Sequence, residues 1–401
     1  MKNPLRKRLF KEFKAEIGKY LVIFIFMTAT IGLISGFIVA SSSMKIAYDN
    51  SFEKYNVEWG HFTVAKELSD ELISDIEKDN KVTMISDYYK NLDTTPEAGG
   101  KSPDDKIRTI RLYKNRDVMN KICIMKGRLA ETDDEIAIDR MYAVNNEIEV
   151  GDTITVDGTD FKVTGYTAFP DYSCLFQDNN DTMFDSLLFT VGITTENAYD
   201  SLDESKEVFN YAWQYENEPA DKKAEKVMSD DFLENIVGKI YATGNSLDIY
   251  IPRYQNRAIN FTGDDLGGDT VMMFTLLYIV MVIMAFVFAV TTNNTILKES
   301  TVIGTLRASG YKKSELLRHY MTLPVLVGLA ACVTGNVLGY TCMKKVGEMA
   351  YYGSYSLTTY VTKFNLTVFL LTTVAPFAML VIINALVIST KLKMSPLKMI
   401  R

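Results

Sequence analysis

The sequence predicts an α-helical membrane protein with four transmembrane helices and a large α+β extracytoplasmic domain inserted between the first and the second. Three observations lead to this fold class. Four long runs of the chain contain no Asp, Glu, Lys or Arg. The stretch between the first two runs is long, polar and acidic. Lys and Arg gather beside the runs in a pattern that assigns a side to each connection.

Each uncharged run is long enough to cross a bilayer. The runs cover residues 20–44, 270–297, 320–343 and 364–390, which are 25, 28, 24 and 27 residues. A spanning helix needs about 20 apolar residues to cross about 30 Å of hydrocarbon. The first run also exceeds the ~7–15 residues of a signal-peptide core, so we expect a retained anchor and not a cleaved leader.

Basic residues predict the orientation in a cell (plasma) membrane. Seven Lys and Arg precede the first run, five lie in residues 298–319 and four in the tail 391–401. Cytoplasmic connections are enriched in these residues, so both termini and the 298–319 loop should be cytoplasmic. Residues 43–269, with 24 Lys and Arg against 45 Asp and Glu, and the short loop 344–363 should then be external.

The N-terminal segment 1–19 has two interpretations. Apolar residues recur in it at helical spacing with cations between them, which is typical of a basic amphipathic helix on the inner leaflet. The alternative is a cytoplasmic extension of the first spanning helix. The apolar positions are Leu5, Leu9, Phe10, Phe13 and Ile17.

The external domain, residues 45–268, mixes helices and strands. Asp157-Gly158 lies between two alternating runs and is a strong hairpin signal within a β-rich insert at about 130–200. Alternation and composition predict the remaining elements. We expect helices at 67–80 and 221–240, and strands at 81–89, 106–114 and 209–217.

Three stretches of this domain carry turn or extended-chain signals. Residues 91–105 are rich in turn formers and predict a mobile tip. Residues 246–261 predict a strand or extended chain. Residues 261–270 predict a linker into the second spanning helix, with Asp264, Asp265 and Asp269 capping and solvating a hinge.

The spanning runs carry small residues at four-residue steps. Such steps let helices approach closely in a membrane, so they predict a helix–helix interface, within the chain or with another copy. No charged residue lies inside a run, which disfavours an ion-coupled transporter. Pro376 should kink the fourth helix. The small residues are Gly32 and Gly36 in the first run, and Ala331, Gly335 and Gly339 in the third.

Nothing in the sequence argues for catalysis, a cofactor or a metal. The EAGGKS stretch at 97–102 lacks the first glycine of a phosphate-binding loop. The two histidines, His61 and His319, are expected on opposite sides of the membrane. Cys123 and Cys174 are both external and could pair, but their spacing does not require it.

The layout and one loop resemble the FtsX-like permease family, the membrane subunits of MacB- and LolC-type (type VII) ABC transporters. The loop reads E-x-x-x-I-G-T-L-R-A-S-G-Y at 299–311, followed by S-E-L-L-R at 314–318. The tail Ser395-Pro396-Leu397 and the external stretches 135–143 and 150–156 also look like this family. Lys312 departs from it, because a capping Ser or Thr is common there; Glu315 or Ser314 could supply the cap instead.

The resemblance implies a permease subunit that works with a separate cytoplasmic ABC ATPase and a second permease unit, as a homodimer or heterodimer, in membrane lipid. ATP hydrolysis in the partner would change the shape of the external domain, a mechanotransmission that exports or extracts a substrate. The alternative is a signalling or scaffold protein whose external domain regulates a partner such as a cell-wall hydrolase. The implied ATPase-coupling residues are Glu299, Ile303, Gly304, Leu306, Arg307 and Gly310.

Overall fold

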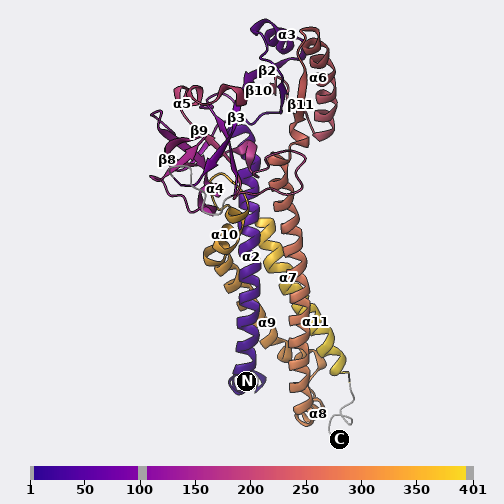
Figure 1. Cartoon of the computed structure of the whole chain (residues 1–401). Helices are drawn as coiled ribbons and strands as arrows, with labels where there is room; N and C mark the ends of the chain where they lie inside the picture. The colour runs from indigo at the N-terminus through magenta and orange to yellow at the C-terminus, as the bar shows by residue number, and fades with distance from the viewer. Residues whose placement is uncertain (1–3, 98–105, 394–401) are drawn as a thin grey trace. The chain divides into compact units, whose positions relative to one another are not determined.

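The computed structural model describes residues 4–97 and 106–393, which form two units. The helical unit contains residues 4–43, 267–350 and 362–393. The sheet unit contains the described residues of 44–266 together with residues 351–361. Figure 1 labels many of the helices and strands of both units.

Four apolar helices dominate the helical unit, and each is long and apolar enough to cross a membrane, as the sequence predicted. The third combines three consecutive elements, α9, the π-helical η4 and α10. α1 is separated from α2 by a bend at Glu16. The bounds are α1 Pro4–Ala15, α2 Ile17–Lys54, α7 Arg257–Lys298, α8 Ser300–Ala308, α9 Lys313–Leu338, η4 Gly339–Met343, α10 Lys344–Ser354 and α11 Leu366–Lys391.

Both small-residue faces are used inside the chain, where α2 packs on α9 and η4. A Cβ on Gly32 would lie 3.3 Å from the Gly335 carbonyl oxygen. A Cβ on Gly36 would lie 2.6 Å from the backbone of Met343, and one on Gly339 would collide with Ser35. The sequence left open whether these faces pack within the chain or against another copy. In the structure they pack against each other within the chain, so they give no support to contact with another copy.

The rest of the helical core is apolar with a few neutral polar pairs. Fully buried side chains include Met27 and Ile31 of α2 and Phe288 of α7. Between α9 and α11, the Thr372 hydroxyl donates to the Asn336 side chain over 2.8 Å. Such neutral pairs can join helices in a bilayer at a modest free-energy gain of about 0.6 kcal/mol.

The sheet unit is built on one eleven-stranded sheet with the order β11-β1-β10-β3-β4-β9-β6-β8-β5; β2 joins it beside β10, and β7 joins beside β3 and β8. The strands are β1 Gly60–Val64, β2 Val82–Ser86, β3 Tyr89–Thr95, β4 Arg108–Tyr113, β5 Cys123–Gly127, β6 Glu135–Asp139, β7 Thr153–Val156, β8 Thr159–Ala168, β9 Phe189–Ile193, β10 Glu207–Tyr215 and β11 Leu247–Pro252. The helices are α3 Asp70–Asn80, α4 Arg140–Asn145, α5 Glu196–Ser201 and α6 Lys222–Ala242, with 3-10 turns η1 Pro170–Tyr172, η2 Glu204–Lys206 and η3 Arg253–Gln255.

The alternation of apolar and polar side chains fixes which face of a strand is buried. The predicted helices and the predicted hairpin are confirmed. β7 and β8 pair antiparallel through Val156 and Thr159, and the two turn residues, Asp157 and Gly158, both have positive φ. This is the backbone that an Asp-Gly hairpin turn requires. At the other end of the sheet, α6 places Phe232 against Phe62 and Trp213 in a buried aromatic core.

Three local expectations were wrong. Residues 91–95 belong to strand β3, because Leu92 and Thr94 alternate inward and pair with β4; residues 98–105 of the expected tip lie outside the described residues. Extended chain ends at Pro252, not 261. The expected hinge at 261–270 is continuous α7 helix, because Gly263 allows the Tyr48 ring close approach and Leu266 is fully buried.

The expected short loop 344–363 is helical at its start, because α10 covers Lys344–Ser354, and residues 351–361 belong to the sheet unit. Arg140 donates to the carbonyl oxygens of Tyr352 and Tyr355 over 2.7 and 2.8 Å. Ser356 donates to the buried Asp139 carboxylate. The Tyr355 hydroxyl donates to Asp265 over 2.5 Å. Residues 351–361 therefore close one end of this unit.

Candidate functional site

We define the elbow as residues 298–320. It contains the short helix α8, which is separated from α7 at Glu299 and from α9 at residues 309–312. α8 ends at Ala308, and Gly310 has φ +98°. The Gly310 N–H donates to the Arg307 carbonyl and the Tyr311 N–H to the Leu306 carbonyl, over 3.2 and 3.1 Å. This pair of bonds is a Schellman motif, which satisfies the last carbonyls of a helix and favours glycine at the left-handed position.

The following helix starts where the sequence left two possibilities. Glu315 accepts a hydrogen bond from the Lys312 backbone N–H over 2.9 Å. α9 then begins at Lys313, so Ser314 lies inside the first turn. The carboxylate therefore stabilises a helix start that lacks the capping Ser or Thr.

The inner face of α8 belongs to the chain's own core. Ile303 is fully buried and Gly304 is buried. Leu306 is half-buried and packs against a hydrophobic cluster that contains Ile303 and residues of α7, α9 and α11. Its buried members are Ile296, Ile303, Leu316, Tyr320, Ile388 and Leu392.

The outer face of α8 is exposed. Val302 is 39 % exposed, and Thr305 and Ser309, three and seven residues after it on the same helix face, are also exposed. Lys312 and Lys313 are exposed beyond the break, and Arg307 is half-buried. The larger apolar side chains of α8 that reach the surface are therefore Val302 and, in part, Leu306, whereas Ile303 holds α8 in place.

Glu299 joins the elbow to the N-terminal helix. Its carboxylate lies 2.6 Å from the Arg8 guanidinium of α1 and accepts a hydrogen bond from the Tyr320 hydroxyl over 2.7 Å. Burial alone would lower the pKa of Arg8, but the carboxylates of Glu299 and Glu12 outweigh it and raise the pKa. The sequence indicated Glu299 as an elbow residue but did not indicate its contact with Arg8. Residues 8 and 299 are too far apart in the chain for any spacing rule to connect them.

A second contact between α1 and the elbow runs through Glu12. Its carboxylate lies 3.2 Å from the His319 Nε2 atom, and Glu16 accepts a hydrogen bond from Thr295 over 3.1 Å. Burial raises the pKa of Glu12, but His319 and Arg8 lower it by more. These groups line a polar cavity of about 140 Å³ between α1, α7 and α9. α1 is therefore fastened to both ends of the elbow.

The sheet unit holds a second cluster of charged side chains. Arg116 binds Asp87 with two hydrogen bonds of 2.9 and 2.8 Å and Asp171 with one of 2.8 Å, and all three side chains are at most 6 % exposed. Beside them, Glu58 lies 2.5 Å from His61. Burial raises the pKa of Asp171 to about 6. Arg116 therefore pairs with both aspartates and Glu58 pairs with His61, which is a structural role.

Among residues 4–97 and 106–393, no group of three or more His, Cys, Asp or Glu is placed to hold a metal ion. Cys123 and Cys174 are both buried and unbonded. The elbow presents apolar side chains and cations on a short helix that contacts with the rest of the chain hold in place.

Known proteins resemble two parts of the chain. Residues 274–396 match the FtsX-like permease C-terminal family, which confirms the resemblance for this part. These residues contain the elbow. A structure of the extracellular domain of the noncanonic ABC-type transporter YknZ from Gram-positive bacteria is similar at 13% identity and a TM-score of 0.28, over 48% of this chain and 100% of that chain. No curated relative matches the chain.

Proposed function

We propose that this membrane protein, which carries an FtsX-like permease C-terminal domain at residues 274–396, is the permease subunit of an ABC transporter. A separate cytoplasmic ATPase binds the elbow, and its ATP-driven movement passes through the apolar helices to the sheet unit. The observation that supports this best is the construction of α8: one face is fixed by Ile303 in the chain's own core, while Val302 and Leu306 reach the surface.

In this proposal, the predicted coupling residues have two different tasks. Ile303, Gly304 and Glu299 position the elbow, because they contact the chain itself. Leu306, Arg307 and the exposed Val302 contact the ATPase. Gly310 sets the direction of the break between α8 and α9. The sheet unit lies outside the cell and the elbow inside it.

Val302→Asp tests the docking role. Burying an unpaired charge in a protein groove costs several kcal/mol, so this variant should lose binding of the cognate ATPase and substrate-stimulated ATP hydrolysis in reconstituted membranes. The original side chain is exposed, so insertion and folding should persist. The measurements are pull-down of the ATPase and ATP turnover. Normal binding by Val302→Asp would contradict the proposal.

Ile303→Ala is the matched control, one residue along the same helix. It removes a fully buried side chain and should cost about 2–5 kcal/mol of stability through the cavity it leaves. It adds no charge to the outer face. Because Ile303 positions the elbow without reaching its surface, the folded fraction of this variant should lose less ATPase binding than Val302→Asp does. ATPase binding without any substrate movement in the unaltered protein would favour the signalling role instead.

We also propose that two permease units share one complex. The small-residue faces are occupied within the chain, so the support comes from α7, whose exposed apolar residues alternate at steps of four and three, as in a coiled-coil seam. Native mass measurement with the ATPase present should give two permease units. A stable complex with one unit would refute this. The residues are Met272, Leu276, Ile279, Ile283, Phe286 and Val290.

A further inference from the structure

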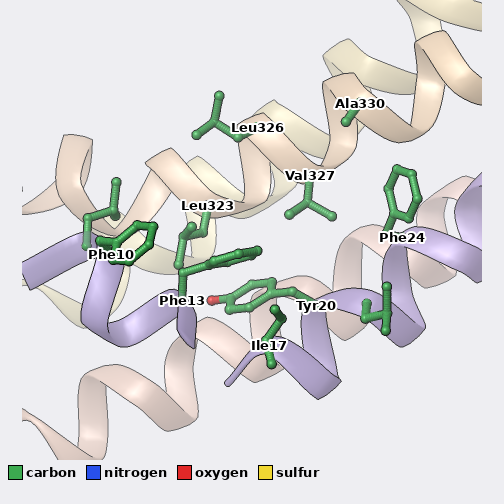
Figure 2. A pocket seen from close by; sticks show the side chains of 11 residues that line it. Phe10, Phe13, Ile17, Tyr20, Phe24, Leu323, Leu326, Val327 and Ala330 are labelled. Atoms are coloured by element: carbon green, nitrogen blue, oxygen red, sulfur yellow. The ribbon is translucent and has the colours of Figure 1, made fainter. Parts of the chain in front are cut away.

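An apolar groove lies between the N-terminal helices and α9 in the helical unit. Its volume is about 630 Å³, within the range of about 300–1,000 Å³ that is usual for small-molecule sites. Figure 2 shows Phe10, Phe13, Tyr20 and Phe24 on one side and Leu326 and Val327 on the other. Every residue that lines it is apolar or aromatic.

The groove is open to the surroundings at its edges. Phe10 is 73 % exposed and Leu326 is 53 % exposed, whereas Tyr20 is buried at the base. All three lie on elements next to or within the predicted spanning helices. The surroundings of this groove are therefore lipid, unless a protein covers it.

Exposed cations lie on the N-terminal helix beside residues that line the groove. Lys14 is exposed and lies four residues after Phe10, so the two side chains are neighbours on the same face of α1. Lys11 is exposed on the adjoining face. An apolar slot with exposed lysines beside it on α1 matches an acyl chain that carries an anionic headgroup. An apolar protein segment would fill the slot and leave the ammonium groups without a counter-charge.

We infer that the groove binds one acyl chain of an anionic phospholipid of the cytoplasmic leaflet, with the headgroup at Lys14. The inference rests on the proposed orientation, which places α1 at that leaflet. The inference also connects the groove with the attachment of α1 to the elbow. Leu9, Tyr20 and Leu323 line both this groove and the polar cavity that contains Glu12, His319 and Glu299. A lipid in the groove therefore packs against the contacts that fasten α1 to the elbow.

The test uses the full chain in vesicles that contain phosphatidylglycerol or phosphatidylcholine with a photoreactive group in the acyl chain. After illumination, labelled peptides are identified by mass spectrometry. We expect labelling of residues 9–24 and 323–330, several-fold stronger for phosphatidylglycerol. Lys14→Glu should reduce the phosphatidylglycerol labelling about fivefold or more, which corresponds to ~1 kcal/mol per cation near an anionic surface.

Arg318→Glu is the matched control. It reverses the charge of an exposed cation on α9 that does not line the groove and lies more than one turn before Leu323, so it should leave the groove labelling unchanged. Equal labelling by both lipids, unaffected by Lys14→Glu, would overturn the inference, because the groove would then be ordinary lipid-facing surface. Strong labelling of exposed α7 residues with none in the groove would also overturn it, because a protein segment would cover the groove. None of these outcomes depends on ATPase binding.

Discussion

At the scale of single residues, His61 is the titratable group whose environment makes the clearest prediction. Burial lowers the pKa of His61, but the nearby Glu58 carboxylate outweighs it and raises the pKa above the ordinary value. Arg111 opposes this effect and Asp87 adds to it. The folded state therefore holds the proton more tightly than the unfolded state does.

The stability of the sheet unit should consequently fall as the pH rises. The contribution of His61 is complete below about pH 6.5, the unfolded pKa, and is lost as the pH passes through the higher folded pKa. Both tryptophans of the chain, Trp59 and Trp213, lie in the sheet unit, so tryptophan fluorescence reports its thermal unfolding in the full chain. His61→Gln should flatten this pH dependence above pH 6.5.

His319→Gln is the control for this experiment, since His319 is the other histidine of the chain and lies in the helical unit. It should leave the pH dependence of the tryptophan transition as it is. An unchanged pH dependence in His61→Gln would mean that the Glu58 contact does not retain the proton. The opposite slope, with stability rising above pH 6.5, would contradict the assigned direction.

Single residues also show what a sequence can and cannot reveal about the site. The break at Gly310 and the use of Glu315 follow from local rules, because a helix end needs partners within a few residues. The burial of Ile303 and the pairing of Glu299 with Arg8 do not, because they depend on which distant segments meet. The resemblance indicated the elbow as a whole, and the three-dimensional contacts divide its residues between the inner and outer face.

At the scale of elements, the close packing of α2 on α9 and η4 depends on glycine. A Cβ on Gly36 would lie 2.6 and 2.8 Å from backbone atoms of Met343 and Lys344, which cannot turn aside as a flexible side chain would. Gly36→Ala should therefore destabilise the helical unit by about 1–3 kcal/mol, the usual cost of overpacking. Loss of helical circular dichroism on heating measures it.

Gly18→Ala is the control within the same helix. Its new Cβ would meet nothing within 4 Å, and alanine favours a helix over glycine by roughly 0.5–1 kcal/mol. This variant should match or exceed the stability of the unaltered chain. Equal behaviour of Gly18→Ala and Gly36→Ala would show that α2 does not approach η4 so closely.

The long helices and the β7–β8 hairpin could be predicted because their signals are local: run length, alternation and the Asp-Gly turn. The stretch 261–270 was misread because three glycines and three aspartates are typical of a linker. In the folded chain, Gly263 makes room for Tyr48 and Asp265 binds Tyr355, so the same residues serve packing. Composition alone does not distinguish a flexible glycine from a packed one.

At the scale of the whole molecule, the proposed orientation can be tested with single cysteines in a chain whose four native cysteines are replaced by serine. Thr159, beside the β7–β8 turn, and Ser309, at the end of α8, are both exposed. A membrane-impermeant maleimide should label Thr159→Cys in intact cells and Ser309→Cys only after permeabilisation. The reverse pattern would invert the proposed orientation.

The sheet unit draws on two separated parts of the chain, and this affects its biosynthesis. Asp139 and Arg140 find their partners in residues 351–361, which follow residue 266 by 85–95 positions. At a synthesis rate of roughly 5–20 residues per second, those partners arrive about 4–19 s after residue 266. During that interval a buried carboxylate and a guanidinium lack their final hydrogen bonds. The nascent sheet unit therefore stays incomplete until the third apolar helix has been synthesised. A chain whose ribosome stalls between residues 266 and 351 should consequently be susceptible to quality-control proteases.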